Sequence, residues 1–172
     1  MINRRYTAVR APFGSLYLTA ENGRIVRIDT MKPTIADGLQ SGHNPVLIDA
    51  ASRLKTYFNG EEQAPAIDCL ESFSPFQQSI YAYARSIPYG ETRTLEESAE
   101  QIGKPHAVHA IKMLCLSNPL WIVVPTHRIT WDCPDSKGQL RPEEALRRME
   151  ARYRQRNLAQ PLDKEDKRGY TF

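Results

Sequence analysis

The alternation of apolar and polar positions predicts a strand-rich start to the chain, followed by one helix. Residues 5–30 predict β-strands, and Asn22-Gly23 separates two of them. Asparagine followed by glycine supplies the positive φ angles of a tight hairpin turn. Residues 31–45 are rich in proline and glycine and predict a loop. The next segment predicts a helix that ends at Asn59-Gly60, because apolar residues recur at helical spacing: Leu47, Ala51, Leu54 and Phe58.

A clear helix start follows a stretch without periodicity. Residues 64–74 have no helical or strand period and predict a linker. In Ser74-Pro75-Phe76-Gln77, serine caps the helix, proline takes its first position and glutamine completes a capping box. The helix ends near Ile87-Pro88-Tyr89-Gly90.

Two short helices around a glycine turn are predicted next. Thr94 caps a helix over 95–102, the segment Gly103-Lys104-Pro105 breaks it, and a second helix covers 106–116. The pattern is typical of a helix-turn-helix. A pair of packed core helices fits the same pattern equally well.

These elements indicate an α+β protein. We expect an N-terminal α/β domain with a small antiparallel sheet at 1–63 and a linker at 64–74. A mainly helical domain with a winged-helix-like helix-turn-helix would follow at 75–158, and a polar tail at 159–172.

Composition indicates an ordinary soluble protein. Of the 172 residues, 41% are hydrophobic and 25% charged. The longest strongly apolar run, Leu120–Val124, is far shorter than the roughly 20 residues of a membrane span, and the first ten residues lack the apolar block of a secretory signal. Three cysteines without a CxxC indicate neither a disulfide framework nor a zinc finger. We therefore expect a cytoplasmic protein, nucleoid-associated if bacterial, that is monomeric and contacts no membrane.

The small basic excess is concentrated at the C-terminus. Residues 141–172 hold nine basic and six acidic side chains, whereas residues 1–140 balance at 14 each, so the last segment accounts for the net charge of +3. This excess predicts either a helix that faces phosphate or the solvated face of a terminal helix.

The segment Val123-Val124-Pro125-Thr126-His127-Arg128-Ile129 resembles the active-site motif of the O6-alkylguanine-DNA alkyltransferases, whose members read Pro-Cys-His-Arg followed by Val or Ile. The resemblance covers about residues 50–152, with further motifs in the order and spacing of the family: Ser74–Gln77, Ile87–Thr94, Ile102–Pro105 and Ser117–Leu120.

The resemblance implies a fold and an activity. Its members have an N-terminal α/β domain and a helix-turn-helix that binds the minor groove, and they rotate the damaged base out of the duplex. The alkyl group passes irreversibly to a cysteine, without an organic cofactor. The resemblance assigns His127 as the imidazole that relays the proton from the nucleophile, Glu150 as the carboxylate that orients it, and Asn118 as the brace of the turn.

Double-stranded DNA, with or without O6-alkylguanine, is the partner that the resemblance implies, and other repair proteins are further candidates. The residues it places against DNA are Thr94, Leu95, Lys104, His106, Ala107, His109, Ala110, Lys112 and Arg128. The pair His106 and His109 lacks further metal ligands at a suitable spacing, and no cysteine precedes Cys69 to form the N-terminal zinc site of some members. We expect neither a metal nor a cofactor.

Thr126 occupies the position of the acceptor cysteine. A free cysteine has a pKa of about 8.5, and a neighbouring histidine lowers it further, so thiolate is present at neutral pH. A threonine hydroxyl has no such accessible anion and is a weak nucleophile. The sequence therefore predicts that this protein does not accept an alkyl group.

Other positions also depart from the family. Leu95 replaces a tyrosine, His109 replaces the arginine that enters the base stack, and Lys112-Met113-Leu114 replaces small residues. A glycine-rich loop becomes residues 131–138, which keep one glycine. His109 either stacks on the bases or has no role.

A substitute acceptor is poorly supported by the sequence. Cys133 lies in the altered loop, but Asp132 and Asp135 would raise its pKa. Cys115 is expected in the core, beside Leu114 and Leu116.

Three hypotheses follow, in this order of preference. The protein is an alkyltransferase-like member that binds and senses alkylated DNA without reacting. Alternatively, the fold serves as a scaffold or protein-interaction module. The third hypothesis is an active methyltransferase that uses another acceptor.

Overall fold

The N-terminal half of the chain forms a four-stranded sheet. The computed structural model describes residues 4–34, 39–42, 44–132 and 141–159. Its first strands are β1 (Arg4–Ala11), β2 (Gly14–Glu21), β3 (Arg24–Asp29) and β4 (Gln40–Ser41), in the spatial order β3-β2-β1-β4. The first three strands form the expected antiparallel sheet, and the two-residue β4 adds a parallel pair with β1, so the sheet as a whole is mixed. The predicted loop 31–45 also contains the short β4.

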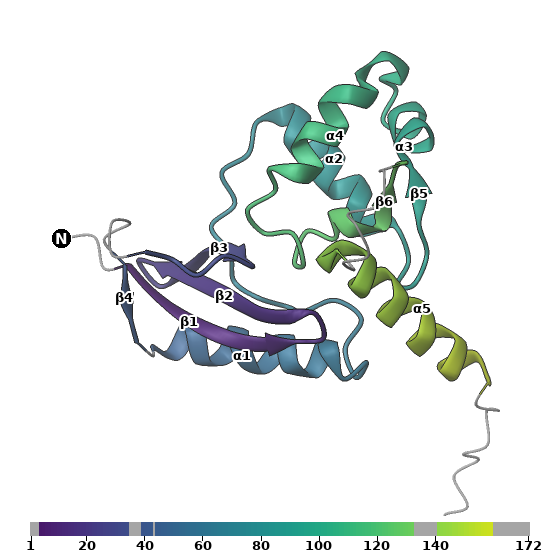
Figure 1. Cartoon of the computed structure of the whole chain (residues 1–172). Helices are drawn as coiled ribbons and strands as arrows, with labels where there is room; N and C mark the ends of the chain where they lie inside the picture. The colour runs from purple at the N-terminus through teal and green to yellow at the C-terminus, as the bar shows by residue number, and fades with distance from the viewer. Residues whose placement is uncertain (1–3, 35–38, 43, 133–140, 160–172) are drawn as a thin grey trace, which may run out of the picture.

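Helix α1 (Pro45–Phe58) covers one face of this sheet (Figure 1). Asn44 caps it by accepting a hydrogen bond from the Leu47 backbone N–H at 2.8 Å. Leu47, Leu54 and the strand residues Leu16 and Leu18 are fully buried, so the apolar stripe of α1 closes the core of this half. The hairpin turn lies at Asn22 and Gly23, both with positive φ, as the sequence predicts.

The C-terminal half is mainly helical. Helix α2 (Pro75–Ser86) begins at the predicted capping box of Ser74 and Gln77, and α3 (Leu95–Gln101) begins at that of Thr94 and Glu97. The predicted helix 106–116 is split into a 3₁₀ turn, η2 (Pro105–Ala107), and α4 (Val108–Leu116). Strands β5 (Arg93–Thr94) and β6 (Ile129–Thr130) form a short parallel pair, and the 3₁₀ turn η3 (Thr126–Arg128) precedes β6.

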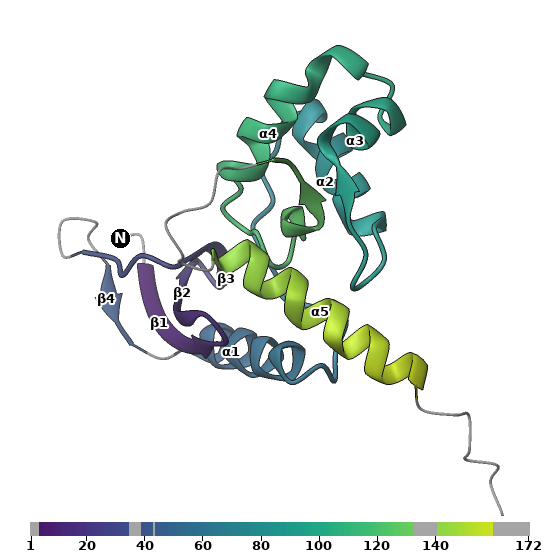
Figure 2. The same ribbon diagram turned by 45° about the vertical axis from the view of Figure 1, so that its right-hand side comes forward.

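Helix α5 (Pro142–Ala159) connects the two halves. Figure 2 shows it passing the C-terminal end of α1. The Tyr153 hydroxyl lies 3.3 Å from the Phe58 carbonyl oxygen. At the β3 edge of the sheet, the backbone N–H of Ile28 donates to the carbonyl of Pro119 at 2.8 Å, and the indole N–H of Trp121 donates to the Ile28 carbonyl at 3.1 Å. These contacts hold the motif segment against the sheet.

None of the helices in the described ranges combines the length and the apolar character needed to cross a bilayer.

Candidate active site

The motif residues lie on the buried turn η3. Thr126, His127 and Arg128 are 3%, 2% and 5% exposed. Leu120 and Val124, which precede the turn, are fully buried and anchor it in the core. The turn is therefore held rigidly, as a reactive position requires.

Asn118 braces this turn from the preceding loop. Its side-chain amide donates to the Val124 carbonyl and to the Thr126 Oγ1, both at 3.0 Å, and its Oδ1 accepts from the Leu120 backbone N–H at 3.0 Å. Both N–H groups of the amide and its oxygen are thus engaged. Asn118 therefore links the loop before the motif to the turn η3.

A cavity of about 310 Å³ lies beside Thr126. Met31 and Leu116, both largely exposed, border it. The cavity is lined by residues from the end of β3 and the loop after it, the end of α4 and the segment that follows it, the motif turn, the residue after β6 and the start of α5: Arg27, Ile28, Asp29, Thr30, Met31, Cys115, Leu116, Ser117, Asn118, Pro119, Trp121, Thr126, Trp131, Pro142 and Glu143. Both halves of the chain therefore contribute to one site.

The carboxylate of Glu150 gathers donors from three segments of the chain: α1, the loop before β5 and the turn η3. Its Oε1 accepts from the Tyr57 hydroxyl at 2.6 Å and lies 2.9 Å from the His127 Nε2 and from an Arg128 guanidinium nitrogen. Its Oε2 accepts from the Arg128 Nε at 2.9 Å and from the Gly90 backbone N–H at 3.0 Å. Since Glu150 is 1% exposed, these bonds replace the water that the charge has lost.

This environment keeps Glu150 ionised and determines which nitrogen of His127 carries the proton. Burial raises the pKa of Glu150, but the hydrogen bonds and charges of His127 and Arg128 lower it more, so that its pKa lies at about 2. An ionised carboxylate can only accept, so the His127 Nε2 carries a proton toward it. In the neutral ring the basic lone pair is then on Nδ1, which is buried and has no hydrogen-bond partner among the described residues.

Because the pKa of Glu150 is depressed in the folded protein, the free energy of unfolding should fall as the solution becomes acidic. The folded protein holds this pKa at about 2, against a usual 4.5, so the stabilisation is complete above pH 4.5 and is lost as the pH falls toward 2. We expect this group alone to remove about 3 kcal/mol of unfolding free energy across that window. Urea denaturation at a series of pH values measures it. A Glu150→Gln variant should show a flatter profile, and an unchanged profile would contradict the assignment.

Gly90 allows the loop before β5 to reach Glu150. It has a φ of +75°, and a Cβ here would lie 2.9 Å from the Glu150 carbonyl oxygen and from the Arg154 Cβ. We expect Gly90→Ala to lower the unfolding free energy by about 3 kcal/mol, through both backbone strain and overlap. Gly103→Ala is the matched control: its φ is +69°, but nothing lies within 4 Å, so only about 1 kcal/mol is expected. If urea denaturation showed equal losses of unfolding free energy in the two variants, the close approach of Gly90 to Glu150 and Arg154 would not contribute to stability.

Comparison with known proteins places this chain in a family. A family model described as "6-O-methylguanine DNA methyltransferase, DNA binding domain" matches residues 75–155. The constitutive methylated-DNA–protein-cysteine methyltransferase of Bacillus subtilis is 32% identical over 130 residues, which cover 72% of this chain and 79% of that protein. The Mycobacterium leprae methylated-DNA–protein-cysteine methyltransferase is 34% identical over 123 residues, covering 69% and 73%. This chain belongs to the methylated-DNA–protein-cysteine methyltransferase family.

Solved structures of this methyltransferase family share the α+β fold. The Mycobacterium tuberculosis O6-methylguanine methyltransferase matches with a TM-score of 0.73 and 26% identity, covering 89% of this chain and 94% of that one. The OGT of the same bacterium in complex with DNA matches with a TM-score of 0.69 and 27% identity, covering 87% and 94%. The α+β class predicted from the sequence is confirmed.

Two residues that the resemblance places against DNA are buried in this family member. Arg128 donates to the Ile87 carbonyl at 2.8 Å and to the Gln63 carbonyl at 3.2 Å, besides its ion pair with Glu150. Leu95, 3% exposed, begins α3 and faces the core. Their burial disfavours a side-chain contact with DNA: in this structure Arg128 neutralises a buried carboxylate, and Leu95 follows the ordinary preference of an apolar residue for the core.

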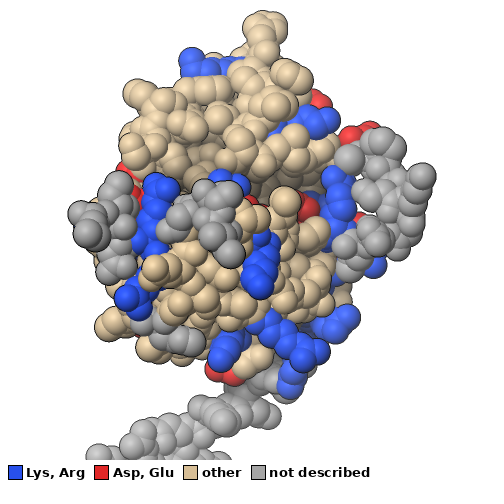
Figure 3. All heavy atoms as spheres, turned by 60° about the vertical axis from the view of Figure 1, so that its left-hand side comes forward, with Lys and Arg blue, Asp and Glu red and all other residues tan. Residues whose placement is uncertain are grey.

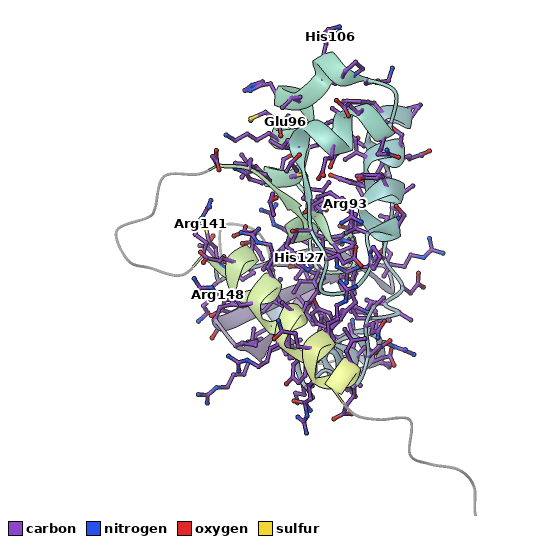
Figure 4. All side chains as sticks on the ribbon, turned by 90° about the vertical axis from the view of Figure 1, so that its right-hand side faces the viewer. Arg93, Glu96, His106, His127, Arg141 and Arg148 are labelled. Atoms are coloured by element: carbon purple, nitrogen blue, oxygen red, sulfur yellow. The ribbon has the colours of Figure 1, made fainter. Side chains whose placement is uncertain are left out.

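The other residues placed against DNA keep some access to solvent. Thr94, Lys104, His106, His109 and Ala110 are exposed, and Ala107 and Lys112 are half-buried. Figure 4 shows His106 at one extremity of the molecule and His127 well inside it, beside α5. In the described ranges, His106 and His109 belong to no group of three or more metal-ligating side chains.

Some features of the site carry no signal in the sequence. Tyr57 is 93 residues away from Glu150 along the chain, yet it forms the shortest bond to that carboxylate. Lys112 lies 5.9 Å from the ring centre of Trp131, which borders the cavity. Cys115 is buried, as expected, but it also lines the cavity. Cys133, most of the altered loop 131–138 and nearly all of the predicted tail 159–172 lie outside the described residues.

Proposed function

We propose that this protein binds duplex DNA that contains O6-alkylguanine and holds the flipped base beside Thr126 without accepting its alkyl group. The observation that carries the proposal is the oxygen of Thr126, buried on η3 and bordering the cavity where this family has its acceptor cysteine. The match of residues 75–155 to the DNA-binding domain of the family supports the DNA partner.

The surroundings of Thr126 do not activate its hydroxyl. Its oxygen accepts a hydrogen bond from Asn118, and no base among the described residues accepts its proton. His127 lines a separate cavity of about 20 Å³, which Thr126 does not border. An alcohol needs an adjacent base to become a nucleophile, so the geometry favours binding over transfer.

Cys115 is a poor substitute acceptor, although it borders the same cavity. Burial raises the pKa of its thiol to about 12. The reactive thiolate is therefore nearly absent at neutral pH. This disfavours the hypothesis of an active methyltransferase with another acceptor.

Basic side chains favour an anionic partner. Figure 3 shows that, on the face it presents, lysine and arginine gather over the sheet half, whereas the helical half is largely uncharged. On α5, Arg148, Arg152 and Arg156 are exposed. Such residues contribute to the salt-dependent, sequence-independent part of DNA binding.

A titration at stated salt concentration tests the proposal. We expect a duplex with one O6-methylguanine to bind more tightly than the unmodified duplex, measured by fluorescence anisotropy. Ala110→Asp, on exposed α4, should weaken binding of both duplexes about tenfold by repelling phosphate. The same change at exposed Ala82 of α2 is the control and should have little effect. Equal affinity of the protein for the two duplexes would rule out lesion sensing.

A second candidate function is a protein-interaction module. Met113 and Leu116 on α4 are 50% and 57% exposed, and apolar side chains of this size on a surface helix favour a protein partner. If the folded protein bound no duplex even at low salt, this second function would replace the first.

A further inference from the structure

We infer that the Thr126 hydroxyl is a hydrogen-bond donor that selects O6-alkylguanines whose substituent carries a neutral acceptor, such as a hydroxyalkyl group. This inference rests on the proposed function and specifies its ligand.

The first step concerns the proton of the hydroxyl. A threonine hydroxyl has one proton to donate and two lone pairs. The Asn118 amide donates to Oγ1 at 3.0 Å, so one lone pair is used. The other polar atoms of Asn118 are occupied by Val124 and Leu120, and no described residue accepts the Thr126 proton. The hydroxyl therefore has a donor to offer.

The second step concerns where this donor can be used. Thr126 is 3% exposed and borders the cavity of about 310 Å³. The buried His127 borders the smaller cavity instead, and Leu116, Trp131 and Glu143 line both. A ligand in the larger cavity is thus the group best placed to accept a hydrogen bond from the Thr126 hydroxyl.

The third step concerns which part of the ligand meets Thr126. The related methylated-DNA–protein-cysteine methyltransferases pass a methyl group to a cysteine. The motif Pro125-Thr126-His127-Arg128 puts residue 126 at the position of that cysteine, so its side chain should reach the alkyl substituent. A methyl or propyl group has no acceptor, and a buried hydroxyl facing it loses its hydrogen bond to water. A hydroxyalkyl group restores that bond.

The charges around the cavity favour a neutral substituent over an anionic one. Among the charged lining residues, Asp29 and Glu143 are acidic and only Arg27 is basic. Arg27 is already paired with Asp29 at 2.8 Å. A carboxylate in the substituent would add negative charge to a site without a free cation in its described lining.

A matched pair of lesions isolates this hydrogen bond. O6-(2-hydroxyethyl)guanine and O6-propylguanine have equal numbers of heavy atoms and differ only by hydroxyl against methyl. We expect the wild-type protein to bind the hydroxyethyl duplex about fivefold more tightly than the propyl duplex, once each affinity is referred to unmodified DNA. Fluorescence anisotropy with all three duplexes measures the ratio.

Variants assign the effect to Thr126. Thr126→Val has the same shape without the hydroxyl and should abolish the preference, whereas Thr126→Ser keeps the hydroxyl and should retain it. Affinity for the propyl duplex shows that Thr126→Val is folded, and Thr126→Ala replaces it if it is not. A preference that survives in both variants without the hydroxyl would overturn the inference and point to Thr30 or Ser117, which also line the cavity.

The outcomes separate this inference from the proposed function. If the wild-type protein prefers both lesions to guanine but binds them equally, the inference fails and the proposed function stands. If it prefers neither lesion to guanine, both fail.

Discussion

Replacing Thr126 with cysteine should turn this protein into one that alkylates itself. We expect Thr126→Cys to gain one methyl group per chain when it is mixed with a duplex containing O6-methylguanine, whereas the wild-type protein gains none. Intact-protein mass spectrometry measures the gain. The expected change is from no detectable transfer to stoichiometric transfer.

The physical reason is that the site already has the groups that assist a thiol. At neutral pH, roughly 3% of the molecules of an unperturbed cysteine are in the thiolate form. The Asn118 amide, which donates to Oγ1 of Thr126, would donate to the sulfur. The resemblance assigns His127, which lies 2.9 Å from the ionised Glu150, as the relay of the thiol proton.

Thr126→Ser is the matched control for this experiment. It removes the methyl group that crowds the approach but keeps an alcohol, so it should remain unalkylated. If the cysteine variant binds the lesion duplex but its mass stays unchanged, the groups around residue 126 do not form a competent site. If the serine variant is alkylated, the argument from nucleophilicity is wrong.

Loss of the Glu150 charge should have the largest effect on stability. In Glu150→Gln the guanidinium of Arg128 remains buried without its counter-ion, and the new amide N–H groups face other donors. Breaking a buried ion pair by removing one partner costs about 3–5 kcal/mol. We expect a loss of this size in the unfolding free energy, measured in urea at neutral pH.

Glu144→Gln provides the control on the same helix. Glu144 is paired with Arg148, whose side chain is 67% exposed. Pairs of this kind contribute about 0–1 kcal/mol, so the control variant should unfold near the wild-type midpoint. A Glu150→Gln variant that is no less stable than Glu144→Gln would show that the carboxylate does not hold the two halves together.

Local chemistry made much of the fold predictable. The capping boxes at Ser74 and Thr94 need only residues three positions apart, and Asn22-Gly23 determines its own turn, so these elements are confirmed. Leu95 was also readable from the sequence. Leu95 is apolar and precedes Ala99 by one helical turn, a spacing typical of a core-facing stripe, although the resemblance suggested a DNA contact.

Contacts distant in sequence account for what the sequence missed. Arg128 follows His127 in the motif, and nothing local shows that its side chain turns inward to a carboxylate 22 residues away. Tyr57 donates to the same carboxylate from α1, and only the packing of α1 near α5 brings the two residues together. The cavity wall likewise combines Met31 with Cys115, and no periodicity along the chain brings these residues together.

One measurement tests the central claim most directly. The wild-type protein, incubated with excess duplex containing O6-methylguanine, is analysed by intact mass while its affinity for that duplex is determined in the same buffer. The account predicts an unchanged protein mass together with tighter binding of the lesion than of unmodified DNA. Recovery of a methylated chain would contradict it.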